Sequence, residues 1–240
     1  MTEVWIADTD SFGAIPLSLF DLLDTSEKER AGTIASTQDR RLFVVSRILL
    51  RHALSTVLGG SPRDWRFGVG EQGKPILCDS QDSSSVDFNL SHSGSAVAVS
   101  ISVSRSSEGR VGVDIELVDP EGFRGSAAPL SLFYSARELA ILYRLPPALR
   151  WKETLRLWTV KEAYAKFLGL GIHLDFSKLE VPSFSSKICL ETHLLTVGGR
   201  QYQLALASTP DRSSSFSPFH WVDFQKILSA PPTYERSWVS

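Results

Sequence analysis

Apolar side chains recur at helical spacing in two long segments, one in each half of the chain. In residues 157–171 they fall three or four positions apart, which predicts one apolar face of a helix that ends at Gly169. Residues 38–58 are apolar on several faces, so we expect a second long helix that is buried. Shorter helices are predicted over residues 131–143 and over residues 18–33, the latter with the charged side chains of residues 27–30 in solvent.

Short strands are predicted around these helices. Residues 96–104 alternate apolar and small polar side chains, as a half-buried strand does, and Gly198-Gly199 indicates a hairpin. Each half therefore offers one long helix and several strands, although no internal sequence repeat is visible. The other expected strands cover residues 4–7, 66–79 (as a pair), 86–90, 111–116, 178–181, 188–197, 202–208 and 220–224.

Length and composition suit one large domain or two domains of about 120 residues. The chain has 240 residues, of which 42% are hydrophobic, and a formal net charge of −2, so nothing indicates a nucleic-acid partner. No apolar run reaches the ~18 residues of a membrane-spanning helix, and the acidic start does not resemble a secretory signal. Two distant cysteines outside any CxxC motif are expected to stay reduced, so we expect a cytoplasmic protein.

A dinucleotide-binding interpretation is rejected for the glycine-rich segment at residues 68–73. Its sequence, GVGEQG, matches GxGxxG, but that motif requires a helix directly after it. Here Lys74-Pro75 and a strand-like segment follow, so we expect a hairpin instead.

Carboxylates on one strand face are the first sign of chemistry. Side chains alternate along a strand, so Gly112, Asp114 and Glu116 face one side, with the two carboxylates ~6.5–7 Å apart. Like charges at that spacing repel, and a divalent cation would remove the repulsion. The ordinary alternative is an exposed strand face.

Polar side chains on the helix in residues 157–171 form a second candidate group. Thr159, Glu162 and Lys166 share a face, with Glu162 and Lys166 one turn apart. The ordinary alternative is a surface ion pair worth ~0.2–0.5 kcal/mol.

Two further polar features remain open to more than one interpretation. His92 and its neighbouring serines are expected in a tight connection between two strands, where amides and hydroxyls converge, although a lone loop histidine is usually just solvated. Arg40, Arg47 and Arg51 fall on one line of a helix, either as a solvated stripe or as a row of cations that faces phosphate groups.

Three motifs resemble those of the Sfp-type 4′-phosphopantetheinyl transferases. In chain order they are FNLSHSG (residues 88–94), VGVDIE (111–116) and WTVKEAYAK (158–166). Gly73-Lys74-Pro75 also resembles an element of that family. The resemblance runs from about residue 30 to residue 208, and the third motif is its most specific part.

The resemblance implies an α/β (α+β) fold with a pseudo-two-fold pair of similar subdomains, each with a long helix packed on a small, mainly antiparallel sheet. We place the subdomains at residues 1–117 and 118–240, separated near the Pro- and Gly-rich linker that starts at residue 117, with the active site between them. The implied enzyme is a monomer that moves phosphopantetheine from coenzyme A to a serine of an apo acyl or peptidyl carrier protein. The other product would be adenosine 3′,5′-bisphosphate.

Roles for individual residues follow from the same resemblance. Asp114, Glu116 and Glu162 would hold Mg²⁺, with Mn²⁺ as an alternative, and Glu162 is also the expected base for the serine proton. Lys166 would stabilise the leaving phosphate, unless it is only an ion-pair partner of Glu162. Trp158 is expected to be core packing. The implied contacts to coenzyme A are Arg30, Arg47, Arg51, Lys74, Ser91, His92, Lys161 and Lys166, of which Arg30 and Lys161 could instead be merely solvated.

The segment that precedes the catalytic helix is expected to receive the carrier. Its apolar and cationic side chains suit a small acidic partner, and they are Phe123, Arg124, Leu130, Phe133, Tyr134 and Arg137. Two rival functions use the same residues: a Mg²⁺-dependent diphosphate hydrolase that acts on coenzyme A, and a coenzyme A binding module without catalysis. A serine hydrolase is disfavoured because the chain lacks a GxSxG elbow.

Overall fold

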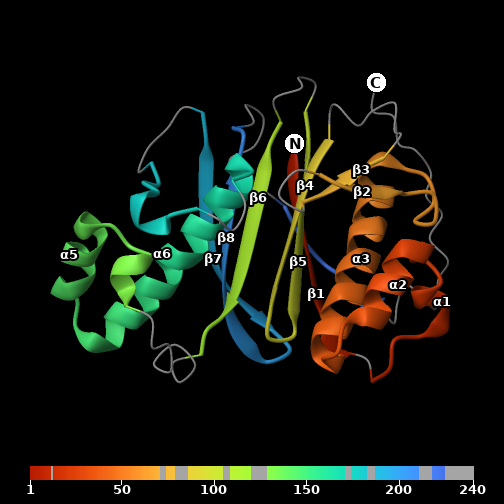
Figure 1. Cartoon of the computed structure of the whole chain (residues 1–240), viewed down its shortest axis with the longest axis horizontal. Helices are drawn as coiled ribbons and strands as arrows, with labels where there is room; N and C mark the ends of the chain where they lie inside the picture. The colour runs from red at the N-terminus through yellow and green to blue at the C-terminus, as the bar shows by residue number, and fades with distance from the viewer. Residues whose placement is uncertain are drawn as a thin grey trace.

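Two sheets lie face to face in the middle of the molecule, and one long helix covers the outer face of each (Figure 1). The computed structural model describes residues 1–11, 13–70, 74–78, 86–104, 109–119, 129–170, 174–182, 187–210 and 218–224. The layers therefore run helix, sheet, sheet, helix, which confirms the expected pair of α/β halves.

The first sheet has the strand order β4-β5-β1-β9. Neighbouring strands run antiparallel except β1 and β9, which pair in parallel. Separately, β2 and β3, which lie before and after residues 71–73, pair antiparallel, as expected from the residues that follow the GxGxxG motif. The bounds are β1 (Thr2–Asp8), β2 (Phe67–Val69), β3 (Pro75–Leu77), β4 (Val86–Ser93), β5 (Ala96–Val103) and β9 (Phe219–Trp221).

The second sheet is antiparallel, in the order β6-β8-β7. It consists of β6 (Val111–Leu117), β7 (Cys189–Val197) and β8 (Arg200–Ser208), and Gly198 and Gly199 turn the β7–β8 hairpin with positive φ, as predicted. Because β6 belongs to this sheet, the change of sheet falls between β5 and β6. The expected boundary at residue 117 is therefore placed too late in the chain.

The helices are α1 (Leu17–Phe20), α2 (Thr25–Thr33), α3 (Thr37–Leu58), α5 (Ala136–Arg144) and α6 (Pro147–Leu168), with 3₁₀ turns η1 (Thr9–Ser11), η4 (Leu130–Leu132) and η5 (Phe176–Lys178). The single helix expected over residues 18–33 is wrong, because Asp24 caps the start of α2 through a reciprocal capping box with Glu27. The strand expected over 178–181 is wrong too, since η5 precedes irregular chain there. No described helix is long and apolar enough to cross a membrane.

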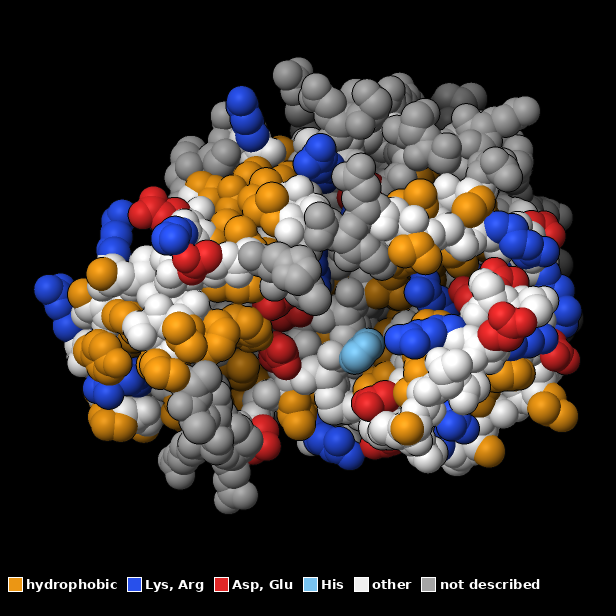
Figure 2. All heavy atoms as spheres, viewed as in Figure 1, with side chains coloured by type: hydrophobic (Ala, Val, Ile, Leu, Met, Phe, Trp, Pro, Cys, Tyr) orange, Lys and Arg blue, Asp and Glu red, His pale blue; other side chains and the backbone are white. Residues whose placement is uncertain are grey.

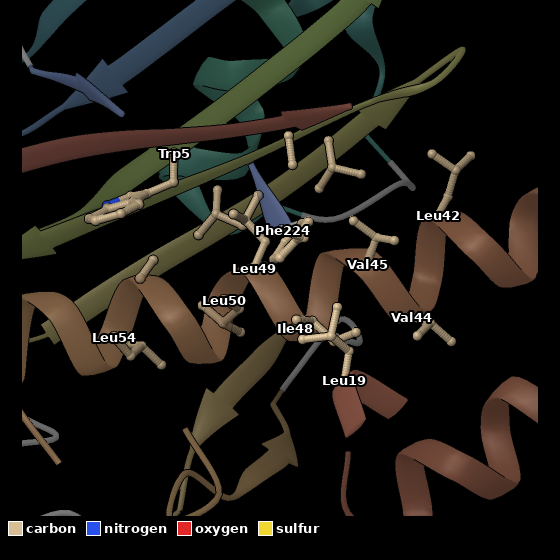
Figure 3. Close-up of a cluster of buried hydrophobic side chains, with 14 of the residues drawn as sticks. Trp5, Leu19, Leu42, Val44, Val45, Ile48, Leu49, Leu50, Leu54 and Phe224 are labelled. Atoms are coloured by element: carbon tan, nitrogen blue, oxygen red, sulfur yellow. The ribbon is translucent and has the colours of Figure 1, made fainter. Parts of the chain in front are cut away.

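The helix α3 lies on the outer face of the first sheet because its apolar residues cover several faces. Figure 3 shows Leu49 of this helix close to Phe224, on the side of the sheet, and Ile48 close to Leu19 of α1, and all of them belong to one core cluster with Trp5 of β1. Ser36 accepts a hydrogen bond from the Asp39 N–H at the start of the helix, and Gly59 with φ 78° ends it. The expected long buried helix is thus confirmed.

Glu27 and Arg51 depart from the expected solvent exposure. Glu27 is 6% exposed and Arg51 is fully buried, and the two form a close ion pair that joins α2 to α3. Arg51 also donates to the carbonyl oxygens of Pro62 and Trp65. Its helical position alone could not show this, because the partners come from elements before and after α3.

The two sheets share a core and are also linked along β4 and β6. The shared core includes Val4 and Ile6 of β1, and Val113 and Ile115 of β6. Along the seam, alternate side chains of β4 accept hydrogen bonds from alternate backbone N–H groups of β6. The donor–acceptor pairs are Val111 to Asp87 (2.8 Å), Val113 to Asn89 (3.4 Å), Ile115 to Ser91 (3.4 Å) and Leu117 to Ser93 (3.0 Å).

Gly112 lets α6 approach the second sheet closely. A Cβ atom at this position would lie 2.1 Å from the Ala163 carbonyl oxygen and 2.4 Å from the Phe167 nitrogen. The helix backbone therefore rests directly on β6 at Gly112. The next two side chains on the same face of β6, Asp114 and Glu116, lie beside the helix. Gly169, in the left-handed conformation, ends α6 as predicted, but the helix already begins at Pro147.

Candidate functional site

A cavity of about 430 Å³ opens between the two halves, where α3, β3, β4, β6 and α6 meet. Figure 2 shows acidic side chains near the middle of this face of the molecule, with an apolar area on one side and cations on the other. The residues that line it include the carboxylates Asp114, Glu116 and Glu162, the basic side chains Arg47, His92 and Lys166, and the apolar residues Phe43, Pro75, Leu90 and Trp158.

Asp114 is the most buried carboxylate of the site, at 3% exposure. Its Oδ1 accepts hydrogen bonds from Lys166 Nζ at 2.7 Å and from Ser91 Oγ at 2.8 Å. Its Oδ2 is buried without a hydrogen-bond partner. Burial raises the pKa of Asp114, and the contacts with Lys166 and Ser91 oppose that rise.

Glu116 lies two residues further along the same face of β6, as the alternation predicts. Ser93 Oγ donates to its Oε2 at 2.9 Å, and Trp158 Nε1 donates to its Oε1 at 3.3 Å. Burial and the nearby charge of Asp114 raise the pKa of Glu116, while the two hydrogen bonds lower it.

Glu162 joins the strand carboxylates from α6. Burial, followed by the charges of Asp114 and Glu116, raises its pKa to about 7, although the cation of Lys166 acts in the other direction. A carboxyl group with a pKa near neutrality changes protonation at the pH where a cell works, which suits a group that accepts a proton.

Lys166 lies one turn from Glu162, yet its ion pair among the described residues is with Asp114. It also donates to Ser91 Oγ at 3.1 Å and to the Val113 carbonyl oxygen at 3.2 Å. The ordinary alternative, a surface pair of Glu162 with Lys166, is therefore not what the structure shows. Lys166 instead ties α6 to β4 and β6 at the cavity.

His92 and Arg47 approach the cavity from the first half. His92 lies near the end of β4 rather than in the turn where we expected it, because the strand continues to Ser93. Desolvation and the Lys166 cation lower its pKa. Arg47 projects from α3, is 20% exposed and lies 3.8 Å from Glu27.

Four other residues expected to contact coenzyme A do not line this cavity. Arg51 is held within the first half by Glu27, and Lys161 is fully buried with its Nζ 2.6 Å from Glu138. Lys74 pairs with Asp87 at 2.6 Å. Arg30 is exposed on α2, where it donates to Thr33.

Lys161 has a clear structural role instead of the expected contact with the substrate. Its ammonium group lies 5.6 Å from the ring centroid of Tyr134 and pairs with Glu138, which also caps the start of α5 through Ser135. Tyr134, expected on a docking surface, is only 3% exposed and donates to the Thr154 carbonyl oxygen. Lys161 therefore fastens α5 to α6, and Tyr134 fastens the segment before α5 to the same helix. Of the other expected docking residues, Phe123 and Arg124 lie outside the described residues, while Arg137 is exposed.

Comparison with known proteins identifies the family. Residues 12–104 match the family described as 4′-phosphopantetheinyl transferase, N-terminal, and residues 110–217 match the 4′-phosphopantetheinyl transferase superfamily. The chain belongs to this superfamily. The two matched segments meet where the structure changes from β5 to β6, between the two sheets.

Individual relatives agree with this assignment. The 4′-phosphopantetheinyl transferase HetI of Nostoc sp. is 35% identical over 150 residues, which cover 62% of this chain and 61% of HetI. The transferase AcpT of Salmonella typhimurium is 30% identical over 165 residues, which cover 64% of this chain and 78% of AcpT. A Bacillus subtilis 4′-phosphopantetheinyl transferase is 26% identical over 159 residues, with 66% of each chain covered. The chain thus spans less than two thirds of the length of HetI.

The carboxylates that line the cavity fit a divalent cation by their chemistry. Oxygen ligands from carboxylates are those that Mg²⁺ prefers, and the buried Oδ2 of Asp114 lacks a partner that a cation would supply. Among the described residues, no three acidic, histidine or cysteine side chains lie close enough together to form a complete ligand cluster as they stand.

Two residues that contact Glu116 have hydrogen bonds that sequence reasoning missed. Trp158 was expected to be core packing, but its indole N–H donates to Glu116. Ser93 was considered only as a neighbour of His92, yet it contacts both Glu116 and the backbone of β6. The polar alternation of Asp87, Asn89, Ser91 and Ser93 in β4 was the available signal for the seam.

Proposed function

We propose that the protein transfers the 4′-phosphopantetheine group of coenzyme A to a serine of an apo acyl or peptidyl carrier protein. The observation that supports this most strongly is the meeting of the β6 carboxylates with Glu162 and Lys166 of α6 at one cavity between the halves. This arrangement places acidic groups and cations together, which a reaction at a diphosphate requires.

In the proposed reaction, the carrier serine oxygen attacks the diphosphate phosphorus that bears the pantetheine arm. A new P–O bond to serine forms, and the P–O bond to adenosine 3′,5′-bisphosphate breaks. Glu162 accepts the proton of the serine hydroxyl, for which its raised pKa is suited. Lys166, already directed into the cavity beside Asp114, stabilises the negative charge on the leaving phosphate.

Asp114, Glu116 and Glu162 are the residues that would hold Mg²⁺, or Mn²⁺ in its place. When bound, the cation draws charge from the diphosphate and orients it for attack. Ser91 and Lys166 hold one oxygen of Asp114 and leave the other without a hydrogen-bond partner.

Coenzyme A would reach this site from the side of the first half. His92 and Arg47 line the cavity there and suit phosphate groups of the nucleotide. Ser91 is already engaged with Asp114 and Lys166, so its contribution is to the carboxylate site. We leave Arg51 and Lys161 out of the proposed contacts because both are fully buried in other ion pairs.

The direct test is to incubate the protein with coenzyme A, Mg²⁺ and an apo-carrier, and then to weigh the carrier by mass spectrometry. We expect the mass to rise by one phosphopantetheine group and to stay unchanged when a chelator is added. Release of phosphopantetheine to water without any carrier would instead indicate a diphosphate hydrolase. Binding of coenzyme A with neither reaction would indicate a binding module.

A further inference from the structure

The carboxylate of Glu116 is held from two directions. Ser93, on β4 of the first sheet, donates to one oxygen, and Trp158, on α6, donates to the other. The acceptor itself lies on β6, between these two elements. Each carboxylate oxygen therefore has its own donor, and the two donors come from different elements, β4 and α6.

The Trp158 ring is itself fixed by aromatic neighbours. Phe133 meets it edge-on, with ring centroids 5.3 Å apart and an interplanar angle of 85°, and Phe176 lies 5.1 Å away at 37°. The indole N–H is thus kept directed at Glu116 by residues that follow η4 and begin η5.

The Ser93 hydroxyl has a similarly fixed direction. It accepts a hydrogen bond from the Leu117 N–H at 3.0 Å, so its own proton is available for Glu116. Because a hydroxyl has one proton, the bond with the strand backbone orients the bond with the carboxylate. Ser93 thereby connects the seam between the sheets with the acidic site.

We propose that Trp158 and Ser93 are positioning residues that hold Glu116 in the orientation in which it binds the divalent cation together with coenzyme A. The inference rests on the proposed function, since it assigns Glu116 to that cation. A glutamate has more rotatable bonds than an aspartate, so Glu116 needs such restraint. Groups that orient a ligand in this way typically change metal affinity by about 10- to 100-fold when removed.

Replacement of Trp158 by phenylalanine separates positioning from packing. Trp158→Phe keeps an aromatic ring between Phe133 and Phe176 but removes the N–H donor. Ser93→Ala removes the other donor, and Ser93→Thr retains a hydroxyl. Trp151→Phe is the matched control, because Trp151 lies on the same helix but outside the cavity, where Lys152 approaches its ring.

The experiment measures equilibrium binding of Mn²⁺ by calorimetry in the presence of coenzyme A, and the metal concentration that gives half-maximal transfer. We expect Trp158→Phe and Ser93→Ala each to weaken Mn²⁺ binding about tenfold. Ser93→Thr and Trp151→Phe are expected to bind Mn²⁺ as the unaltered protein does. Thermal unfolding of each variant shows whether it remains folded.

A loss of thermal stability without a change in Mn²⁺ affinity would overturn the inference, because a purely structural role predicts that result. If Trp158→Phe does not fold, the same comparison of thermal stability with Mn²⁺ affinity is made with Ser93→Ala. Suppose the unaltered protein binds Mn²⁺ with coenzyme A but modifies no carrier. The proposed function then fails, whereas a tenfold shift in Trp158→Phe still supports the positioning role. Absence of Mn²⁺ binding to the unaltered protein would overturn both.

Discussion

At the scale of single residues, three carboxylates line one cavity in a partly desolvated place. Burial raises the pKa values of Asp114, Glu116 and Glu162, and repulsion by neighbouring carboxylates adds to the rise for Glu116 and Glu162. A carboxyl group with a raised pKa still binds a proton in the folded state at a pH where the same group in the unfolded chain has lost its proton. The free energy of unfolding therefore falls as pH rises from about 4.5 to about 7 for Glu162.

This repulsion predicts opposite effects of Glu162→Gln on stability and on activity. In a chelator at pH 8 we expect the variant to unfold at a higher temperature, because one crowded charge is gone; the gain is on the order of 1–2 kcal/mol. Transfer to a carrier is expected to fall at least about 100-fold, since the proposed base is absent. Calorimetric unfolding and carrier mass spectrometry measure the two effects.

Glu153→Gln is the control, because Glu153 lies on the same helix and pairs with Arg156 outside the cavity. It is expected to retain activity and to gain no stability. A Glu162→Gln variant that is less stable than the unaltered protein at pH 8 would contradict the idea that the carboxylates repel one another in the folded state.

At the scale of elements, the contact of α6 with β6 depends on the missing side chain of Gly112. A Cβ there would overlap backbone atoms of α6, which cannot move aside as a flexible side chain can. We predict that Gly112→Ala displaces the helix, lowers the free energy of unfolding by several kcal/mol and reduces transfer strongly. Chemical denaturation and the carrier assay provide the measurements.

Gly32→Ala is a matched control for Gly112→Ala. Gly32 lies within α2, and nothing approaches a Cβ built at that position. The same substitution is expected there to raise stability by about 0.5–1 kcal/mol, since glycine lowers helix stability. Equal stability changes in both variants would show that the close approach of α6 is not what constrains Gly112.

The helix α5 is the element that we propose for carrier docking. Its Arg137 is exposed beside the partly apolar groove that contains Ile141, and carriers of this kind are expected to be acidic. Arg137→Glu is predicted to raise the carrier KM about tenfold through repulsion while leaving the coenzyme A KM unchanged. Arg63→Glu, an exposed charge reversal in the first half, is the control. Equal increases in both KM values for Arg137→Glu would reject this docking surface.

At the scale of the whole molecule, the two halves are bound together by a shared core and a polar seam. Residues of β1, β5, β6 and β8 contribute to one buried cluster, so neither sheet buries its inner face alone. We therefore expect one cooperative unfolding transition rather than one per half. Urea unfolding followed by circular dichroism and by tryptophan fluorescence should give coincident curves.

Asn89→Ala tests how much the hydrogen bonds between β4 and β6 contribute to the free energy of unfolding. Asn89 is 7% exposed and accepts from the buried Val113 N–H, which would lose its partner. The expected loss is about 1–3 kcal/mol, with the two probes still coincident. Separate transitions for the two probes would show that the halves are independently stable.

Much of the architecture follows from local pattern. Helical spacing located α3 and the C-terminal part of α6, because burial of one face imposes a period on the sequence. Strands were also expected at β5, β6, β7 and β8, although β5 is buried on both faces and not half-buried as its alternation indicated. Prediction failed where local signals compete. Asp24 interrupts the segment over residues 18–33 by capping a new helix, and Pro147 starts α6 because proline is tolerated in a first helical turn.

The sequence by itself determined which side chains share a face: Asp114 with Glu116 on β6, and Glu162 with Lys166 on α6. Period and spacing suffice for that, since they depend only on the local backbone. The tertiary structure alone decided which cations reach the cavity. Lys166 pairs with Asp114, whereas Arg51 and Lys161 are buried against carboxylates far away in the sequence. A charge acts on whatever folding brings near it, and no local pattern specifies that neighbour.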